Sequence, residues 1–96
     1  MEERFSCLDV LPISWTTASG AQQRVCGTLL EVWSSGGIIH TYEPIAKGET
    51  FRIGVHGTQL EARVEKYERD EYGCYLEFRL AGPWFPANYE PPYLMN

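Results

Sequence analysis

The hexapeptide Leu60-Glu61-Ala62-Arg63-Val64-Glu65 alternates strictly between apolar and charged residues. A period of two is typical of a β-strand that buries one face and leaves the other in water. Segments 51–55 and 76–80 show the same alternation. The centre of the chain is therefore predicted to be sheet with one solvated face.

Three more strands are expected before this centre. Segments 10–17 and 22–33 are rich in β-branched and aromatic residues, and the short apolar segment 38–42 follows Ser34-Ser35-Gly36-Gly37. We interpret these four residues as a turn in which the glycines take positive φ. Turn residues also occur between the other segments, and residues 67–71 are expected to end a strand. Six short strands with regular turns predict an all-β protein, and we favour a six-stranded antiparallel barrel over the alternative, a β-sandwich.

Residues 81–96 differ in composition from residues 1–80, and we treat them as a tail after the barrel. The tail holds four of the six prolines, a density that precludes a regular helix or a central strand. It also holds aromatic residues, which are scarce in disordered segments. We expect the tail to pack on the barrel; the alternative is that it docks onto a protein partner. The candidates for docking are Trp84, Phe85, Tyr89 and Tyr93.

The composition limits the classes of function. Ninety-six residues with a net charge of −5 suit one small core and disfavour non-specific binding to nucleic acid or to anionic membranes. Cys7, Cys26 and Cys74 lack the spacing of a metal site, so we expect no metal and three buried or half-buried thiols. The acidic start resembles no signal peptide and the apolar runs are too short to span a bilayer, which predicts a cytoplasmic protein.

The search for catalytic motifs argues against an enzyme. Ser34 is not part of a Gly-x-Ser-x-Gly motif, and no lysine follows Gly36-Gly37 as a phosphate-binding loop requires. Carboxylates such as Glu61 and Glu77 alternate with apolar residues, as on a solvated sheet face. His40 and His56 are expected to be strand and turn residues, and no cofactor is predicted.

Three motifs, in this order, give the chain its resemblance to a known family. They are Ser34-Ser35-Gly36-Gly37, the Pro-x-x-x-Gly loop at 44–48, and the Gly-x-x-x-Glu-Phe strand at 73–78. Over residues 3–80 the chain resembles a PilZ domain, the bacterial module that serves as a receptor for cyclic di-GMP. The resemblance implies a six-stranded antiparallel barrel and a role in second-messenger signalling.

The resemblance also implies where a ligand would bind. The family holds cyclic di-GMP through an Arg-x-x-x-Arg motif and an Asp/Asn-x-Ser-x-x-Gly motif. In this chain Ser34 and Gly37 match the second motif, but Val32 stands at its polar position. Glu3 and Cys7 stand at the two arginine positions, and Arg4 is one residue out of register. Because charge-assisted phosphate contacts would be lost, weak or absent binding of cyclic di-GMP is expected.

Three functions follow as hypotheses. The first is a non-enzymatic PilZ-like adaptor that acts through a protein partner. The second is a true cyclic di-GMP receptor with a shifted motif, using Arg4, Ser34 and Gly37 as ligand-binding residues. The third is a small barrel that binds single-stranded nucleic acid; against it, basic and acidic residues are mixed along 61–69 rather than forming a positive stripe.

Overall fold

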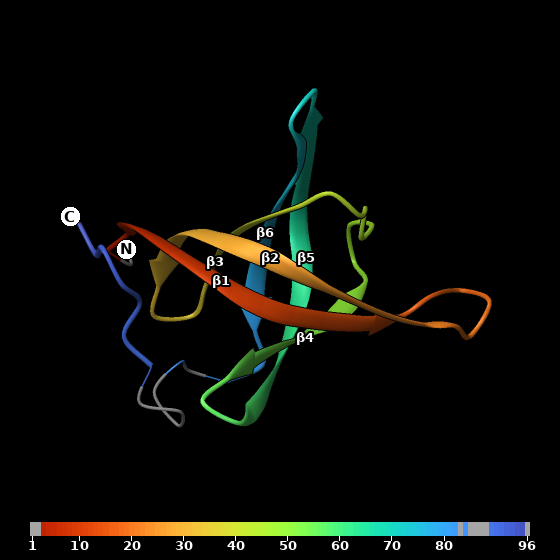
Figure 1. The fold of residues 1–96 in the computed structure, drawn as a ribbon, viewed down its shortest axis with the longest axis horizontal. Coiled ribbons are helices and arrows are strands. Elements are labelled where there is room, and N and C mark those ends of the chain that lie inside the picture. Colours follow the sequence, from red (N-terminus) through yellow and green to blue (C-terminus); the bar gives the residue numbers. More distant parts are fainter. Residues whose placement is uncertain (1–2, 83, 85–88, 96) are drawn as a thin grey trace.

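The computed structural model describes residues 3–82, 84 and 89–95, in which six strands form a closed antiparallel barrel (Figure 1). The strands are β1 (Phe5–Thr16), β2 (Gln22–Trp33), β3 (Gly36–Thr41), β4 (Thr50–Val55), β5 (Thr58–Asp70) and β6 (Gly73–Leu80). Their order around the barrel is β1-β2-β3-β6-β5-β4, and β4 pairs with β1 to close it. The predicted fold class is confirmed. Among the described residues no helix has the length and apolar character needed to cross a membrane.

The alternation at residues 60–65 decides which side chains enter the core. Ala62 and Val64 of β5 are 1% exposed, while Glu61 and Arg63 point into solvent. The other strands bury their inward residues in the same way, which removes apolar surface from water. The largest fully buried aliphatic and aromatic side chains are Phe51, Phe78, Leu29, Ile39, Ile45, Ile53, Leu76 and Trp84.

Strand β1 begins at Phe5, five residues before the predicted start at Val10. The early part was missed because Asp9 stands on the inward face, between the buried Cys7 and Leu11. A carboxylate at such a position interrupts the apolar pattern. The tail supplies a hydrogen-bond donor for this carboxylate: the Tyr89 hydroxyl donates to Asp9 Oδ2 at 2.7 Å.

The interpretation of Gly36 and Gly37 as turn residues with positive φ is wrong. Both belong to β3, neither has positive φ, and the β2–β3 turn consists of Ser34 and Ser35 alone. Glycine is needed here for space. A Cβ on Gly36 would overlap the Phe78 carbonyl of β6, and one on Gly37 would lie 2.5 Å from the Glu31 carbonyl oxygen.

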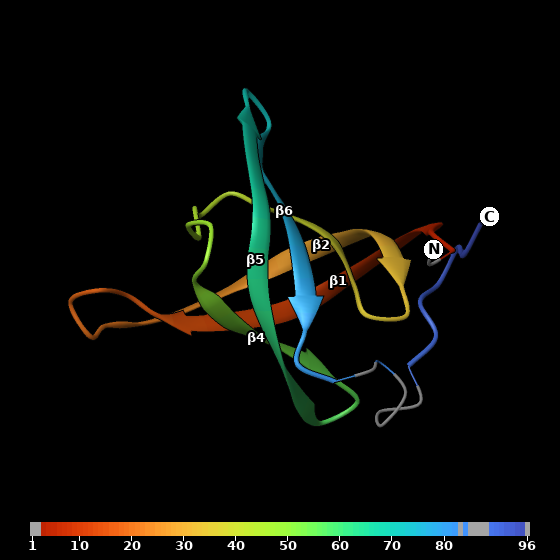
Figure 2. The ribbon, with the colours of Figure 1, turned by 180° about the vertical axis from the view of Figure 1, so that it is seen from behind.

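The described part of the tail, Trp84 and residues 89–95, packs on the barrel, as predicted. Trp84 is 2% exposed, its ring lies against Phe78 and Tyr89, and its Nε1 donates a hydrogen bond to the Gly36 carbonyl at 3.0 Å. The later part of the tail then runs beside the start of β1, which places Met95 next to Ser6 (Figures 1 and 2). Ser6 and Met95 exchange two backbone hydrogen bonds, each of 2.7 Å.

The cysteines are all free thiols, but their burial differs from the prediction. Cys7 and Cys74 are buried, whereas Cys26 is exposed because it projects from the outer face of β2, between the inward positions of Val25 and Gly27. Cys7 Sγ donates a hydrogen bond to the Leu29 carbonyl at 3.8 Å. Burial, with the nearby negative charges, raises the pKa of the Cys7 thiol to about 11.

Candidate functional site

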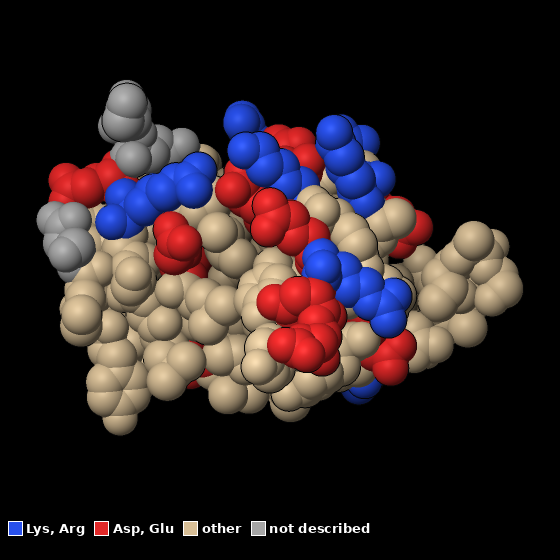
Figure 3. All heavy atoms as spheres, turned by 90° about the horizontal axis from the view of Figure 1, so that it is seen from above, with Lys and Arg blue, Asp and Glu red and all other residues tan. Residues whose placement is uncertain are grey.

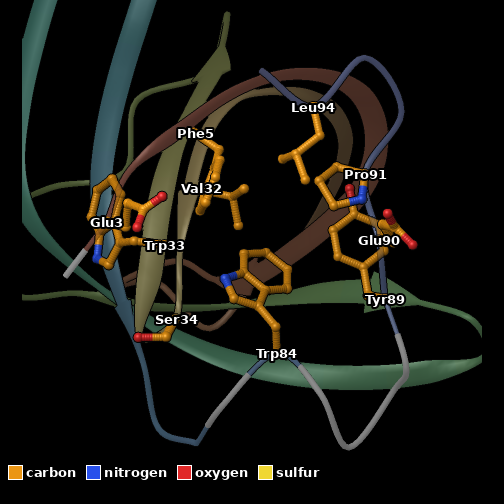
Figure 4. Close-up of a pocket in the computed structure, with 10 residues that line it drawn as sticks. All are labelled: Glu3, Phe5, Val32, Trp33, Ser34, Trp84, Tyr89, Glu90, Pro91 and Leu94. Carbon is orange, nitrogen blue, oxygen red and sulfur yellow. The ribbon is translucent and has the colours of Figure 1, made fainter. Parts of the chain in front are cut away.

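A cavity of about 660 Å³ opens beside Ser34, where the start of β1, the end of β2 and the tail meet (Figure 4). We call it the tail cavity. The barrel contributes Glu3, Phe5, Val32, Trp33 and Ser34 to its lining, and the tail contributes Trp84, Tyr89, Glu90, Pro91 and Leu94. Its volume is in the range of pockets that take a small molecule or a peptide side chain.

Most of the lining is apolar. Phe5 and Val32 project from neighbouring strands toward Leu94 and Pro91 of the tail, and the Trp84 ring lies below them (Figure 4). Trp84 cannot move aside easily, because its indole N–H is bonded to the barrel backbone and its ring belongs to the core. The cavity therefore offers a rigid apolar surface to a guest.

The charged groups in the lining are acidic. Glu3 lies beside Trp33 on one side of the cavity, and Glu90 lies on the tail across from it (Figure 4). Of the described residues that line the cavity, none is a lysine or an arginine. Acidic groups in the lining disfavour anionic guests and favour cationic ones.

Arg4, the cation expected near the ligand, is held outside this lining. Its guanidinium stacks over the Trp33 ring, 4.0 Å from the centroid, and Nη1 lies 3.7 Å from Glu77 Oε1. The side chain is half exposed. Arg4 thus contacts Trp33 of the cavity wall without lining the cavity itself, and this contact is a cation–π interaction.

The structure brings together some of the residues predicted from the motifs and separates others. Ser34 and Val32 line the tail cavity together with Glu3. Gly37 does not: it is buried in β3, opposite Val32 in the register of β2 and β3. Cys7, at the second arginine position of the motif, is buried in the core.

Sequence reasoning missed the contribution of the tail to this site. The proline and aromatic content of residues 81–96 indicated packing but not which strands the tail would reach. Leu94 and Pro91 carried no signal of their own. Trp84 and Tyr89, two of the docking candidates, are buried; Tyr93 is 77% exposed, and Phe85 lies outside the described residues.

Among the residues that line the cavity, Tyr89 has a shifted pKa. Burial, followed by the hydrogen bond to Asp9, raises the pKa of Tyr89 above its usual value. His40 lies in β3, with Nε2 2.7 Å from the Tyr72 carbonyl oxygen, and His56 occupies the β4–β5 turn. Within the described ranges no three His, Cys, Asp or Glu side chains are grouped as metal ligands.

Comparisons with models of protein families, with curated proteins and with solved structures gave no match to this chain.

Proposed function

We propose that this chain is a non-enzymatic PilZ-like module that binds cyclic di-GMP weakly or not at all and acts as an adaptor for a protein partner. The acidic, apolar lining of the tail cavity is the observation that carries this proposal. Cyclic di-GMP is a dianion, and its phosphates would face Glu3 and Glu90 with no cationic side chain in the described lining. Val32 supplies no polar atom for a guanine edge.

Isothermal titration calorimetry with cyclic di-GMP tests the first half of the proposal. We expect no saturation below about 1 mM, since each absent charge-assisted contact removes roughly 1.5–3 kcal/mol. Saturable binding at low micromolar concentration would overturn it. A Glu3→Arg variant places a guanidinium where the family motif has one, and is expected to strengthen any residual binding.

The second half concerns the partner. The apolar lining with acidic groups on two sides suits a peptide that inserts an apolar side chain next to a lysine or arginine. Selection from a phage-displayed peptide library should therefore enrich apolar residues flanked by basic ones. Leu94→Asp should abolish the selected binding by placing a charge in the cavity; Leu94 is 41% exposed, so the barrel should still fold. Enrichment of acidic peptides, or binding unchanged in Leu94→Asp, would contradict the adaptor proposal.

The receptor with a shifted motif remains as a second candidate because Arg4 stacks on Trp33 beside Ser34. A guanine base could replace Arg4 on the Trp33 face while the guanidinium bonds a phosphate. In that case Arg4→Ala would remove binding of cyclic di-GMP. The adaptor proposal expects no effect of this variant on the titration.

A further inference from the structure

Three residues form a row across β2, β1 and β4 on the outer face of the barrel. Ser14 of β1 is paired with Arg24 of β2 on one side and with Arg52 of β4 on the other. Residues paired in this way project from the same face of a sheet. Adjacent strands are about 4.8 Å apart, so the two arginines flank Ser14 with their backbones roughly 10 Å apart. We call these residues the arginine row.

The arginine row lines a depression of about 320 Å³. Two glutamines, Gln22 and Gln59, line the same depression and add amide donors to its rim. Ser14 is half-buried between the exposed Arg24 and Arg52, so its hydroxyl lies at the base of the row. The depression shares no lining residue with the tail cavity.

The charges of this row are not neutralised by ion pairs. Elsewhere on the barrel basic groups stand beside acidic ones, as the blue and red side chains of Figure 3 show. Arg79 Nε, for example, lies 3.0 Å from Glu65 Oε1, and Lys66 approaches Glu77. Within the described part of the chain, neither Arg24 nor Arg52 forms an ion pair.

One acidic residue lies next to the row. Glu61 of β5 is paired with Arg52 on the side away from Ser14. Its carboxylate is not within ion-pair distance of the guanidinium, but it lowers the positive potential there. Its removal should therefore strengthen the attraction of an anion.

We propose that the arginine row binds a phosphate monoester group. Each guanidinium can donate two parallel hydrogen bonds to phosphate oxygens, and the Ser14 hydroxyl can donate to an oxygen between them. A tetrahedral dianion has oxygens directed to both sides and to the base, which matches donors placed on three adjacent strands. A flat, singly charged carboxylate would reach only one guanidinium as a bidentate partner.

Titration of the full chain with inorganic phosphate, followed by the amide NMR spectrum, tests the proposal. We expect saturable shifts in β1, β2 and β4 with a Kd of about 1 mM. Arg24→Gln and Arg52→Gln should each weaken binding by about tenfold, and Glu61→Gln should tighten it by about threefold. Arg63→Gln is the matched control: it removes the same charge from an exposed position on β5, and the Kd should stay within about twofold.

A second titration, with dimethyl phosphate, distinguishes a monoester from a diester. This diester carries one charge and has two blocked oxygens, so its binding should be at least about fivefold weaker. Equal affinity for dimethyl phosphate would overturn the assignment to a monoester.

Absence of saturable shifts up to about 20 mM phosphate, or an equal loss of binding in Arg63→Gln and Arg24→Gln, would overturn the site itself. Because Arg24 and Arg52 are exposed, both variants should keep the melting temperature of the parent chain.

Discussion

At the scale of single residues, Gly37 lets β3 lie close to β2, and its position has no room for a Cβ atom. Gly37→Ala would place a Cβ 2.5 Å from the Glu31 carbonyl oxygen and against the Phe78 ring. We expect the free energy of unfolding to fall by about 1–3 kcal/mol, as measured by urea denaturation. Gly82→Ala is the control, because nothing lies within 4 Å of its Cβ. Equal effects of the two variants would contradict this account.

The error over the Ser34–Gly37 turn also belongs to this scale. A glycine pair after two serines is typical of a turn, and the sequence does not distinguish a glycine required for positive φ from one required for close approach. Both uses demand only the absence of a Cβ. The deciding contacts, with Glu31 on β2 and Phe78 on β6, come partly from a strand forty residues away.

The buried thiol of Cys7 makes stability depend on pH in the alkaline range. Its pKa in the folded state is about 11, above the ordinary value of 9.0, so the unfolded chain loses the proton first as pH rises. This contribution is fully present below pH 9 and is lost between pH 9 and 11. We expect the free energy of unfolding to decline over that range, and the decline to be smaller in Cys7→Ala. Cys26→Ala removes an exposed thiol and should leave the slope of the parent chain.

At the scale of elements, the tail contributes Trp84 and Tyr89 to the core of the barrel. Trp84→Ala would empty a fully buried site and leave the Gly36 carbonyl without its donor. The expected cost is about 3–5 kcal/mol, or a fall in melting temperature of at least about 12 °C, measured by circular dichroism. Tyr93→Ala is the control from an exposed tail position. Because the Tyr93 side chain is 77% exposed, this variant should change the free energy of unfolding by less than about 0.5 kcal/mol. A Trp84→Ala protein that melts like the parent would contradict the packing described.

The elements themselves were largely predictable, because three strands alternate between apolar and polar residues and the other three are rich in β-branched, aromatic or apolar residues. The start of β1 was not, since Asp9 is acceptable on the inward face only when Tyr89, eighty residues later, donates to it. The tail cavity was missed for the same reason. Its walls come from the start of β1, the end of β2 and the tail, and no local pattern indicates that Phe5 and Leu94 will line the same cavity.

At the scale of the whole molecule, the tail covers an edge of β1 that β4 leaves unpaired. β1 pairs with β4 only at Ile13 and Ser14, and the earlier part of β1 is instead bonded by the tail at Ser6 and Leu8. The apolar side chains of Leu8 and Val10 are exposed next to this edge. Exposed apolar edge strands tend to pair with other chains.

Removal of residues 90–96 should therefore promote self-association. We expect the shortened chain to form dimers as its concentration rises, as measured by sedimentation velocity. The dissociation constant of the full-length dimer should be at least about tenfold higher. Leu8→Lys in the shortened chain should reverse the effect. Met95→Pro provides a second test within the full chain, since it removes the N–H that bonds the Ser6 carbonyl. Association equal in all of these proteins would contradict a protective role for the tail.

The hydrogen bonds between Ser6 and Met95 also make the connectivity of the chain almost cyclic. A linker of a few glycines between Ser6 and Met95 would cost little entropy, because these two residues are already in contact. A new opening at the exposed Ser19-Gly20 turn would then leave all six strands whole, so the barrel accepts a circular permutation there. For the same reason, a domain joined directly before Ser6 would emerge beside one joined directly after Met95.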